Sequence, residues 1–342
     1  MGKKMAVLGT GAIGSSIGAD LTGAGNDVLL IDQWPEHVEA MKAGGLRFTI
    51  HGEKSQVPVQ AVHLCELAYL KPQFDLVFLA CKSYDSRWLA QLINPYLKPD
   101  GVLVSTQNSL NDEWIAPIIG KERDIACALE LSAEVFEPGI VKRNTDHEVT
   151  RFVIGELDGK VTPRVKEVAQ IMGAVGKTEV STNVWGAKWA KFVYNTMNST
   201  LQAITGLNAA ELIPDPTFVS LAVKLGRETA KVGVASGHTL ALFGLTAQDF
   251  IGAPPETLMA LLKKVTADIG KEAHSCVLQD LMKGRLTEVG DYFNGLVVKK
   301  GRELKIPTPA NEAATAMVRQ IEQGKLKPAL ANLQKLAAQI KG

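Results

Sequence analysis

The chain has 342 residues, of which 46% are hydrophobic and 21% are charged, values ordinary for a globular protein. That length exceeds one comfortable core, so two domains are expected. A net charge of +1 gives no reason to expect nucleic acid or an anionic membrane as a partner, and no apolar run approaches the roughly 20 residues that span a bilayer. The four cysteines show no C-x-x-C spacing, which predicts reduced thiols in a cytoplasmic protein and no metal site.

The first predicted elements are a strand, a glycine turn, a helix and a second strand that ends at an acid. Strand Met5–Leu8 leads into the turn, and helix Gly14–Gly23 leads to strand Val28–Ile31 and then to Asp32. The first glycine makes the turn, the second lets the backbone approach a pyrophosphate, and the third packs the helix on the strand. The helix N-terminus offers free N–H groups to the same pyrophosphate. The pattern predicts a dinucleotide site whose cofactor contacts are Gly9, Gly11, Ala12, Ile13, Gly14 and, for the adenosine ribose, Asp32.

Short apolar strands alternate with helical patterns through the rest of the first half. This alternation predicts an α/β fold with a Rossmann-type, doubly wound, mainly parallel sheet. Further strands are expected at Leu46–Ile50, Leu76–Ala80, Val102–Ser105, Ile125–Leu131 and Thr150–Ile154. Further helices are expected at Pro35–Ala43, Ser86–Tyr96, Asp112–Ile119 and Thr162–Gly173.

After Val184 the strand-like runs largely vanish and long segments with helical periodicity follow, with prolines between them or at their starts. Helices are expected at Trp185–Thr205, Thr217–Ser236, Pro255–Lys271, Val289–Leu304 and Ala310–Gln323, with a final one from Pro328 towards Lys341. We therefore expect a dinucleotide-binding domain over residues 1–182 and an all-helical substrate and catalytic domain over 183–342. The apolar faces of the second domain could bury a homodimer interface.

Two further loops follow strands of the predicted sheet. Ligands of such a sheet bind outside the carboxyl ends of its strands. This rule selects Lys82, after strand Leu76–Ala80, and Asn108, after strand Val102–Ser105. Lys82 could face a phosphate or a substrate carboxylate, and Asn108 could bind the nicotinamide ribose or the substrate. On spacing alone, each is equally well interpreted as a polar loop residue.

The first helix of the second half carries a polar row. Lys191, Asn195 and Ser199 share one helical face at i, i+4 and i+8. Their bulky apolar neighbours predict a buried helix, where a lysine is costly unless it is paired or functional. A lysine that extends its ammonium from the rim of the domain is the competing interpretation, and spacing alone favours it. Farther on, Glu288 opens the predicted helix Val289–Leu304, either as a cap-region carboxylate or as a partner of Lys191.

Together these segments resemble the ketopantoate reductase (2-dehydropantoate 2-reductase) family over essentially the whole chain. In the first half the matching residues are Gly9, Gly11, Gly14, Lys82 and the pair Gln107-Asn108. The family helix Trp-x-Lys-Leu-x-x-Asn corresponds here to Trp189, Lys191, Phe192 and Asn195. The family signature Ser-Met-x-Gln-Asp…Arg-x-Thr-Glu corresponds to Cys276–Asp280, Arg285, Thr287 and Glu288.

The resemblance implies reduction of a 2-keto acid to a 2-hydroxy acid by NAD(P)H, with 2-dehydropantoate, an intermediate of pantothenate biosynthesis, as the substrate. It implies that Lys191 is the general acid and that Glu288 contacts the substrate hydroxyl and orients the active-site groups. Asn108 would place both the nicotinamide and the substrate, and Lys82 would lie on the cofactor side. The remaining substrate contacts would be Asn195, Ser199, Ser275 and Cys276.

Three departures from the family pattern concern the substrate. Cys276 stands where the family usually has serine, Ser199 replaces a second asparagine, and Gly290 is inserted after Thr-Glu-Val. They keep open an NAD-linked D-2-hydroxyacid dehydrogenase with a branched or aromatic substrate. A nicotinamide-binding sensor without turnover is a more distant alternative. A sensor would not need Lys191, yet the chain has Lys191, Asn195 and Glu288 together. An opine or 3-hydroxyacyl dehydrogenase would need a catalytic histidine, and the histidines of the second half have no matching context.

The fourth departure concerns the cofactor. The family generally prefers NADPH, whose 2′-phosphate is met by a basic or neutral residue, whereas this chain has Asp32. Two like charges about 4 Å apart repel by ~1 kcal/mol in water and by more at a lower effective dielectric constant. The following residues, Gln33-Trp34-Pro35-Glu36, supply no compensating base. We therefore expect a preference for NAD(H), with NADP(H) as the choice that the family resemblance implies.

Overall fold

The computed structural model describes residues 2–242 and 244–340 of the chain. These residues form two compact units, the first ending at Val184 and the second beginning at Trp185. Each unit has its own core and is described separately. The roles predicted for the two halves from sequence, cofactor binding and catalysis, remain predictions.

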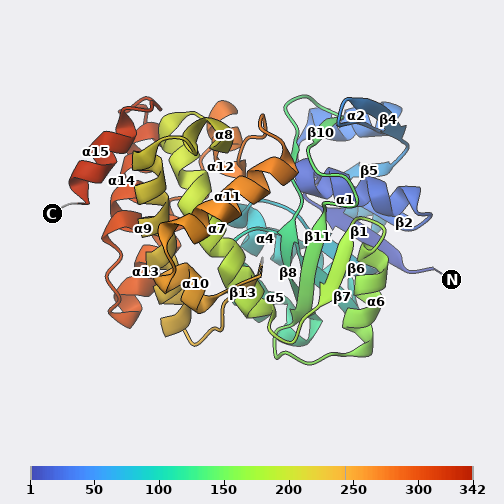
Figure 1. Ribbon diagram of the computed structural model, residues 1–342. Helices are drawn as coiled ribbons and strands as arrows, with labels where there is room; N and C mark the ends of the chain where they lie inside the picture. The colour runs from blue at the N-terminus through green and yellow to red at the C-terminus, as the bar shows by residue number, and fades with distance from the viewer. Residues whose placement is uncertain (1, 243, 341–342) are drawn as a thin grey trace. The chain divides into compact units, whose positions relative to one another are not determined.

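The first unit is built on an eight-stranded sheet with the order β12-β11-β8-β7-β6-β1-β2-β5 (Figure 1). All neighbouring strands are parallel except β8 and β11, which are antiparallel. The strands are β1 (Lys4–Leu8), β2 (Asp27–Asp32), β5 (Gln60–His63), β6 (Phe74–Leu79), β7 (Leu97–Ser105), β8 (Asp124–Glu130), β11 (Arg151–Glu156) and β12 (Lys177–Val180). The predicted doubly wound sheet is confirmed, and its strand order reverses at β1, between β2 and β6.

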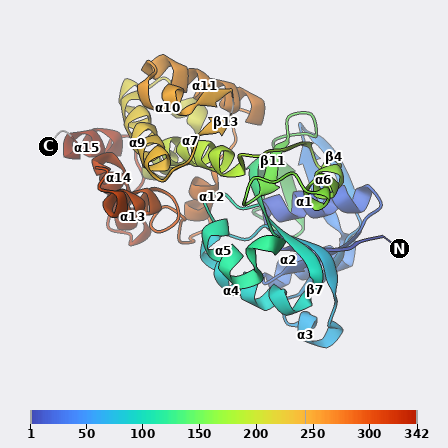
Figure 2. The same ribbon diagram turned by 90° about the horizontal axis from the view of Figure 1, so that it is seen from below.

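Both faces of this sheet are covered, as the apolar strands require. Along β1, Met5 and Val7 pack into one core, and Ala6 and Leu8 pack into another. Figure 2 shows α1 and α6 on one side of the sheet and α4 and α5 on the other. The helices are α1 (Ala12–Gly23), α2 (Pro35–Gly44), α3 (Glu66–Leu70), α4 (Ser86–Ile93), α5 (Asp112–Ile119) and α6 (Pro163–Met172), with single 3₁₀ turns η1 (Ser83–Asp85), η2 (Asn94–Tyr96) and η3 (Lys121–Arg123).

One predicted strand lies in a different sheet. The segment Leu46–Ile50 is β3 of a four-stranded sheet with the order β4-β3-β10-β9, and β5 is the strand that lies beside β2 at the edge of the main sheet. Leu46 and Phe48 are buried while Arg47 is exposed, the alternation of a strand with only one covered face. The other strands of this sheet are β4 (Glu53–Val57), β9 (Ala133–Glu134) and β10 (Ile140–Arg143).

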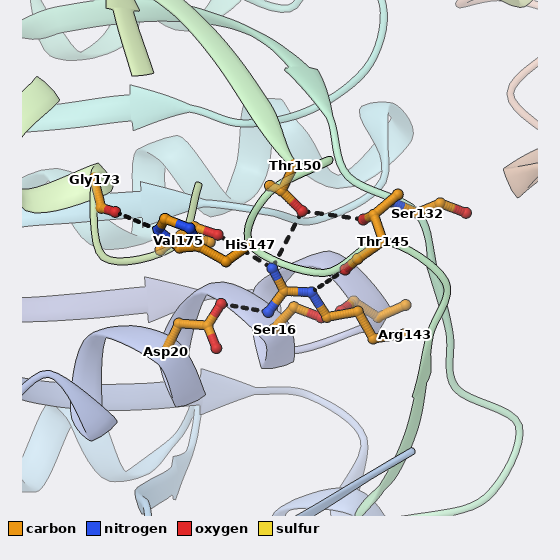
Figure 3. A network of polar contacts seen from close by, with 10 residues as sticks. Ser16, Asp20, Ser132, Arg143, Thr145, His147, Thr150, Gly173 and Val175 are labelled. Carbon is orange, nitrogen blue, oxygen red and sulfur yellow. Dashed lines mark hydrogen bonds and ion pairs between the residues drawn. The ribbon is translucent and has the colours of Figure 1, made fainter. Parts of the chain in front are cut away.

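A buried arginine fastens the small sheet to the rest of the unit (Figure 3). Arg143, at the end of β10, is ion-paired with Asp20 of α1. Its other nitrogens donate to the carbonyl of Thr145 at 2.7 Å, to the Thr150 hydroxyl at 3.2 Å and to the carbonyl of Val175 at 3.1 Å. Burial raises the pKa of Asp20, and the arginine opposes that shift. Because α1 is the helix that follows the glycine turn, this network also holds that helix in place.

The second unit is helical, as predicted, apart from a short hairpin. Its helices are α7 (Val184–Thr205), α8 (Ala209–Leu212), α9 (Pro216–Ala235), α10 (Ala247–Gly252), α11 (Pro255–Ile269), α12 (Cys276–Met282), α13 (Asn294–Leu304), α14 (Pro309–Glu322) and α15 (Asn332–Gln339). The hairpin pairs β13 (Ala241–Leu242) with β14 (Leu245–Thr246). The expected final helix begins at Asn332 rather than Pro328, and Lys341 lies outside the described residues.

The expected helix start at Val289 is wrong. The segment from Val289 to Phe293 is a turn, in which the carbonyl of Glu288 accepts from the N–H groups of Tyr292 at 3.0 Å and Phe293 at 2.8 Å. Phe293 has φ −114° and ψ −109°, outside the helical region, so the helix begins only at Asn294. Glu288 therefore precedes a tight turn and does not open a helix.

Helix α7 packs tightly against α9 because α9 carries glycine where bulky α7 residues lie (Figure 1). A Cβ added at Gly233 would lie 2.8 Å from the Trp189 ring, and one at Gly226 would lie 3.3 Å from the Met197 sulfur. The two helices are also joined by a 2.9 Å hydrogen bond between the Thr196 and Thr229 hydroxyls. This packing fixes the helix that carries the polar row of Lys191, Asn195 and Ser199.

Candidate functional site

The glycine turn lies at the carboxyl end of β1, where the strand order reverses and ligands of such sheets bind. Gly9 has φ +89°, a conformation that favours glycine, and its N–H donates to the carbonyl of Ile31 at 2.9 Å. Gly11 is the N-cap of α1 and has no side chain to cap the helix. The N–H groups of Ala12 and Ile13, the first two residues of α1, therefore belong to the set that has no partner within the helix.

The three glycines differ in the space around them. A Cβ at Gly14 would lie 2.0 Å from the carbonyl oxygen of Gly9, and one at Gly9 would lie 2.8 Å from the backbone nitrogen of Cys81. A Cβ at Gly11 would have no atom within 4 Å. Gly9 and Gly14 are thus needed for the turn itself, whereas Gly11 leaves open space at the helix N-terminus. That pattern fits a pyrophosphate lying against Gly11.

Asp32, at the end of β2, is buried against this turn. One carboxylate oxygen accepts from the Thr10 N–H and, at 3.0 Å, from the Thr10 hydroxyl; the other accepts from the N–H of Trp34 at 2.8 Å. The structure thus brings the predicted ribose acceptor and the glycine turn together. An ionised carboxylate offers about four lone-pair positions, so these contacts leave room for a further donor.

Behind the turn lies a buried histidine that sequence reasoning missed. His37 of α2 accepts at Nδ1 from the Gly139 N–H at 2.9 Å, and its Nε2 is 3.2 Å from the Ser15 hydroxyl. That hydroxyl donates to the carbonyl of Thr10 at 2.6 Å, so it receives the Nε2 proton of a neutral imidazole. Burial lowers the pKa of His37, and the nearby Asp32 charge partly opposes this. A histidine within an amphipathic helix pattern carries no sequence signal for this role.

The loops after β6 and β7 are tied together by buried side chains. Ser86 donates to the Asn111 side-chain oxygen at 2.7 Å, and the Asn111 amide donates to the Ser83 hydroxyl at 3.2 Å and to the carbonyl of Asn108 at 2.5 Å. Lys82 is the residue before η1, in the first of these loops. The structure therefore brings Lys82 and Asn108 to neighbouring loops at the same sheet edge. Sequence reasoning missed Asn111, the residue that joins them.

Gln107 is a buried residue of the same edge. Its amide nitrogen donates to the Ser86 hydroxyl at 3.0 Å, while its side-chain oxygen has no hydrogen bond to any described residue. A buried acceptor left unsatisfied costs about 1–3 kcal/mol. The edge thus holds an open helix N-terminus, a carboxylate and an unfilled acceptor, which together suit a polar ligand.

In the second unit, the predicted row lies on one continuous helix. Asn195 and Ser199 of α7 are buried, and Lys191 is half-buried. The Lys191 ammonium lies over the Tyr194 ring, with its Nζ 4.8 Å from the ring centroid. The row is therefore on the largely buried helix that sequence periodicity predicts, with its charged member at the least buried position.

The position of Glu288 is fixed by the hydrogen bonds of the preceding residue, Thr287. The N–H and the hydroxyl of Thr287 both donate to one carboxylate oxygen of Glu322, at 2.8 and 2.6 Å, which ties the segment to α14. The Thr287 hydroxyl also accepts from the N–H of Val289 at 3.2 Å. Glu288 itself is buried. Sequence reasoning missed Glu322, which lies far from this segment in the chain.

Ser275 and Cys276 form the start of α12. Ser275 is the N-cap, and its hydroxyl accepts from the Leu278 N–H at 3.3 Å. Its own N–H donates to the Gln202 side-chain oxygen on α7 at 3.1 Å, so the structure brings α12 to the helix of Lys191. The Ser275 hydroxyl therefore caps the helix, and Cys276 is the first helical residue of this segment.

Within residues 2–242 and 244–340, no three His, Cys, Asp or Glu side chains gather as metal ligands would. Within the same residues, no helix combines the length and apolar character needed to cross a membrane.

Two family models match the chain: "Ketopantoate reductase PanE/ApbA" over residues 5–159 and "Ketopantoate reductase PanE/ApbA C terminal" over residues 183–322. The 2-dehydropantoate 2-reductase of Pyrococcus abyssi is 30% identical over 311 residues, covering 90% of this chain and 94% of that protein. The same enzyme of Pyrococcus horikoshii is 28% identical over 321 residues, covering 93% of this chain and 97% of that protein.

Among solved structures, the ketopantoate reductase from Ralstonia eutropha JMP134 is similar with a TM-score of 0.78 and 29% identity, covering 94% of this chain and 99% of that one. A ternary structure of D-mandelate dehydrogenase with NADH and anilino(oxo)acetate is similar with a TM-score of 0.81 and 26% identity, covering 94% and 99%. Both likenesses extend over the two units.

Proposed function

The chain belongs to the ketopantoate reductase family, and we propose that it is an oxidoreductase that reduces a 2-keto acid to a 2-hydroxy acid with a nicotinamide cofactor. The observation that carries the proposal is the placement of Lys191, half-buried on α7 with Asn195 and Ser199 following at intervals of one helical turn. Ketopantoate is the proposed substrate, because several of the similar curated proteins are named for it.

The glycine turn, with the N–H groups of Ala12 and Ile13, would hold the pyrophosphate of the cofactor. Asp32 would accept from the adenosine ribose, and Lys82 and Asn108 would line the edge towards the nicotinamide. The cofactor, when bound, supplies the hydride. The open space at Gly11 and the unfilled acceptor of Gln107 support this assignment.

Lys191 would donate a proton to the alkoxide that develops at the keto carbon. A positioned general acid contributes about 10²–10⁴-fold to a rate. Its positive charge would also stabilise the negative oxygen before the proton moves. Glu288 would contact the substrate hydroxyl, and Asn195, Ser199, Ser275 and Cys276 would contact the rest of the substrate.

We further propose that NAD(H) is preferred over NADP(H). Asp32 would face the 2′-position of the ribose, where its charge would repel a phosphate. The lysine of α2, Lys42, is engaged elsewhere: its ammonium lies 2.8 Å from a carboxylate oxygen of Glu66 and 3.5 Å from one of Glu39. Lys42 thus does not offset the charge of Asp32.

A second candidate is an NAD-linked D-2-hydroxyacid dehydrogenase with an aromatic or branched substrate. The D-mandelate dehydrogenase whose structure is similar to this chain was solved with NADH and anilino(oxo)acetate. Cys276, where the family usually has serine, is a weaker hydrogen-bond donor and a more apolar contact. Both observations favour a less polar substrate than ketopantoate.

The experiment that tests these proposals is a screen of NADH and NADPH oxidation with ketopantoate, 2-ketoisovalerate and phenylglyoxylate. Turnover of any of the three supports the reductase, and the largest kcat/KM identifies the substrate class. Fastest turnover of phenylglyoxylate would replace ketopantoate by the second candidate. Absence of turnover with all three acids and both cofactors would contradict the proposed function.

A further inference from the structure

A second polar row runs along α7, beside the row of Lys191. Tyr194, Asn198 and Gln202 are 5%, 3% and 2% exposed and follow one another at intervals of four residues. The amide of Asn198 donates to the Tyr194 hydroxyl at 3.2 Å, and the amide of Gln202 donates to the Asn198 side-chain oxygen at 3.2 Å. At its far end the row reaches α12, through the 3.1 Å bond from the Ser275 N–H to Gln202.

The direction of these hydrogen bonds is determined from the α12 end. A backbone N–H can only donate, so the oxygen of Gln202 must face Ser275. The amide nitrogen of Gln202 then points to the oxygen of Asn198, and the nitrogen of Asn198 points to Tyr194. The start of α12 therefore sets the orientation of both amides and holds the tyrosine hydroxyl.

The other end of the row is the cation of the proposed active site. The Lys191 ammonium lies 4.8 Å from the centroid of the Tyr194 ring, within the roughly 6 Å over which an aromatic face attracts a cation. A lysine side chain has many rotamers, and a fixed ring face restricts where its ammonium lies. Helix packing alone does not require amides at Asn198 and Gln202. Apolar residues would fill the same space and would need no hydrogen-bond partners.

We infer that Tyr194 is a positioning residue that holds the Lys191 ammonium for proton transfer, and that Asn198 and Gln202 fix it from the start of α12. This inference rests on the proposed role of Lys191 as proton donor. It links the segment with the proposed substrate contacts Ser275 and Cys276 to the acid through side chains within α7. A substrate that orders the start of α12 would, by the same row, order the acid.

The test compares Tyr194→Leu, which removes the ring, with Tyr194→Phe, which keeps it, and with Gln202→Met, which releases the row from α12. Phe192→Leu is the matched control, because it removes a neighbouring buried ring of α7 and installs the residue of the family pattern. We expect Tyr194→Leu to lower kcat about tenfold with little change in the KM for the keto acid, because only the acid is displaced. Tyr194→Phe keeps the ring but removes the hydroxyl that Asn198 contacts, so it and Gln202→Met should each lower kcat about threefold.

A second measurement does not depend on turnover. Lys191 is labelled with an amine-reactive reagent, and the modified peptide is quantified by mass spectrometry. Tyr194→Leu should raise the labelling rate of Lys191 several-fold and Tyr194→Phe should raise it less, whereas Phe192→Leu should leave it near wild type. Equal labelling rates in Tyr194→Leu and wild type, or an unchanged kcat in a folded Tyr194→Leu, would overturn the inference. Absence of wild-type turnover would contradict the proposed function, while labelling would still decide whether Tyr194 holds Lys191.

Discussion

The two candidate regions are built from different parts of the chain. At the sheet edge of the first unit, the glycine turn offers mainly backbone: an open space at Gly11 and the N–H groups of Ala12 and Ile13. On α7 in the second unit, the site is made of side chains, and a second row of side chains lies next to it. Backbone geometry follows from local steric demands, whereas a side-chain row depends on its neighbours from other helices. We therefore expect cofactor binding to weaken when a side chain is added to the first region. We expect catalysis to slow when a side chain is removed from the second region.

The largest effect is expected in the second region. Lys191→Ala should lower kcat by about 10²–10⁴-fold, because the general acid is lost. Lys191→Arg should be nearly as slow while still binding keto acid, since arginine keeps the charge but does not give up its proton. Steady-state NADH oxidation measures both. The control is Lys224→Ala, an exposed lysine of α9, and full activity in Lys191→Ala would remove this residue from the mechanism.

The second largest effect is expected in the first region, where a side chain is added and not removed. Gly11→Ala adds one methyl group to the space in which the pyrophosphate is expected, so the Kd for NADH should rise at least about tenfold, or ~1.4 kcal/mol. The melting temperature should stay unchanged, because no protein atom beyond the adjacent residues lies within 4 Å of the new group. Gly23→Ala, at the other end of the same helix and equally free of neighbours, is the control. Unchanged NADH binding in Gly11→Ala would place the cofactor elsewhere.

A smaller effect concerns the choice of cofactor. Asp32→Asn removes the charge and keeps one side-chain oxygen, which can accept from the N–H of Thr10 or of Trp34 but not from both. The ratio of kcat/KM for NADPH to that for NADH should rise at least about fivefold, the equivalent of ~1 kcal/mol of relieved repulsion. Glu36→Gln, an exposed acid of α2, should leave the ratio unchanged. A wild-type enzyme that already prefers NADPH would contradict the NAD(H) proposal.

The smallest effect is a pH dependence of stability at the back of the glycine turn. Burial lowers the pKa of His37 below its ordinary 6.5, so the native state holds this proton less tightly than the unfolded state does. The contribution of neutral His37 to the stability is complete above pH 6.5 and is lost as the pH falls through the lower native pKa. Urea unfolding at pH 7.5, 6.5 and 5.5 should show a decline in wild type that is weaker in His37→Asn. His51→Asn, a change at a histidine whose side chain is 58% exposed, should leave the decline as in wild type.

The glycine turn could be predicted residue by residue because its steric demands are local. Gly9 needs a positive φ and Gly14 has no room for a Cβ, and both requirements show in the sequence. The sheet assignment of Leu46–Ile50 failed because an apolar strand does not encode which partner it pairs with. The turn before Asn294 was missed for a related reason: Val289 and Phe293 are apolar at a helical interval, yet the backbone between them folds onto Glu288.

The partners of the predicted residues could not be read from the sequence. Asp32 was expected to meet a ribose, and its contacts with Thr10 depend on how β1 and β2 end side by side. Glu322 reaches Thr287 from a helix that begins more than twenty residues later in the chain. The roles of the site residues, the homodimer and the cytoplasmic location remain predictions.

The transfer of a hydride to a keto carbon is tested most directly with deuterium. NADH that carries deuterium at both C4 positions of the nicotinamide is incubated with the enzyme and with ketopantoate, 2-ketoisovalerate or phenylglyoxylate, and the 2-hydroxy acid is analysed by mass spectrometry. We predict a product with one deuterium at C2, formed at a rate that falls by about 10²–10⁴-fold in Lys191→Ala. A product without deuterium, or none from any of the three acids, would contradict the proposal that this chain is a nicotinamide-linked 2-keto acid reductase.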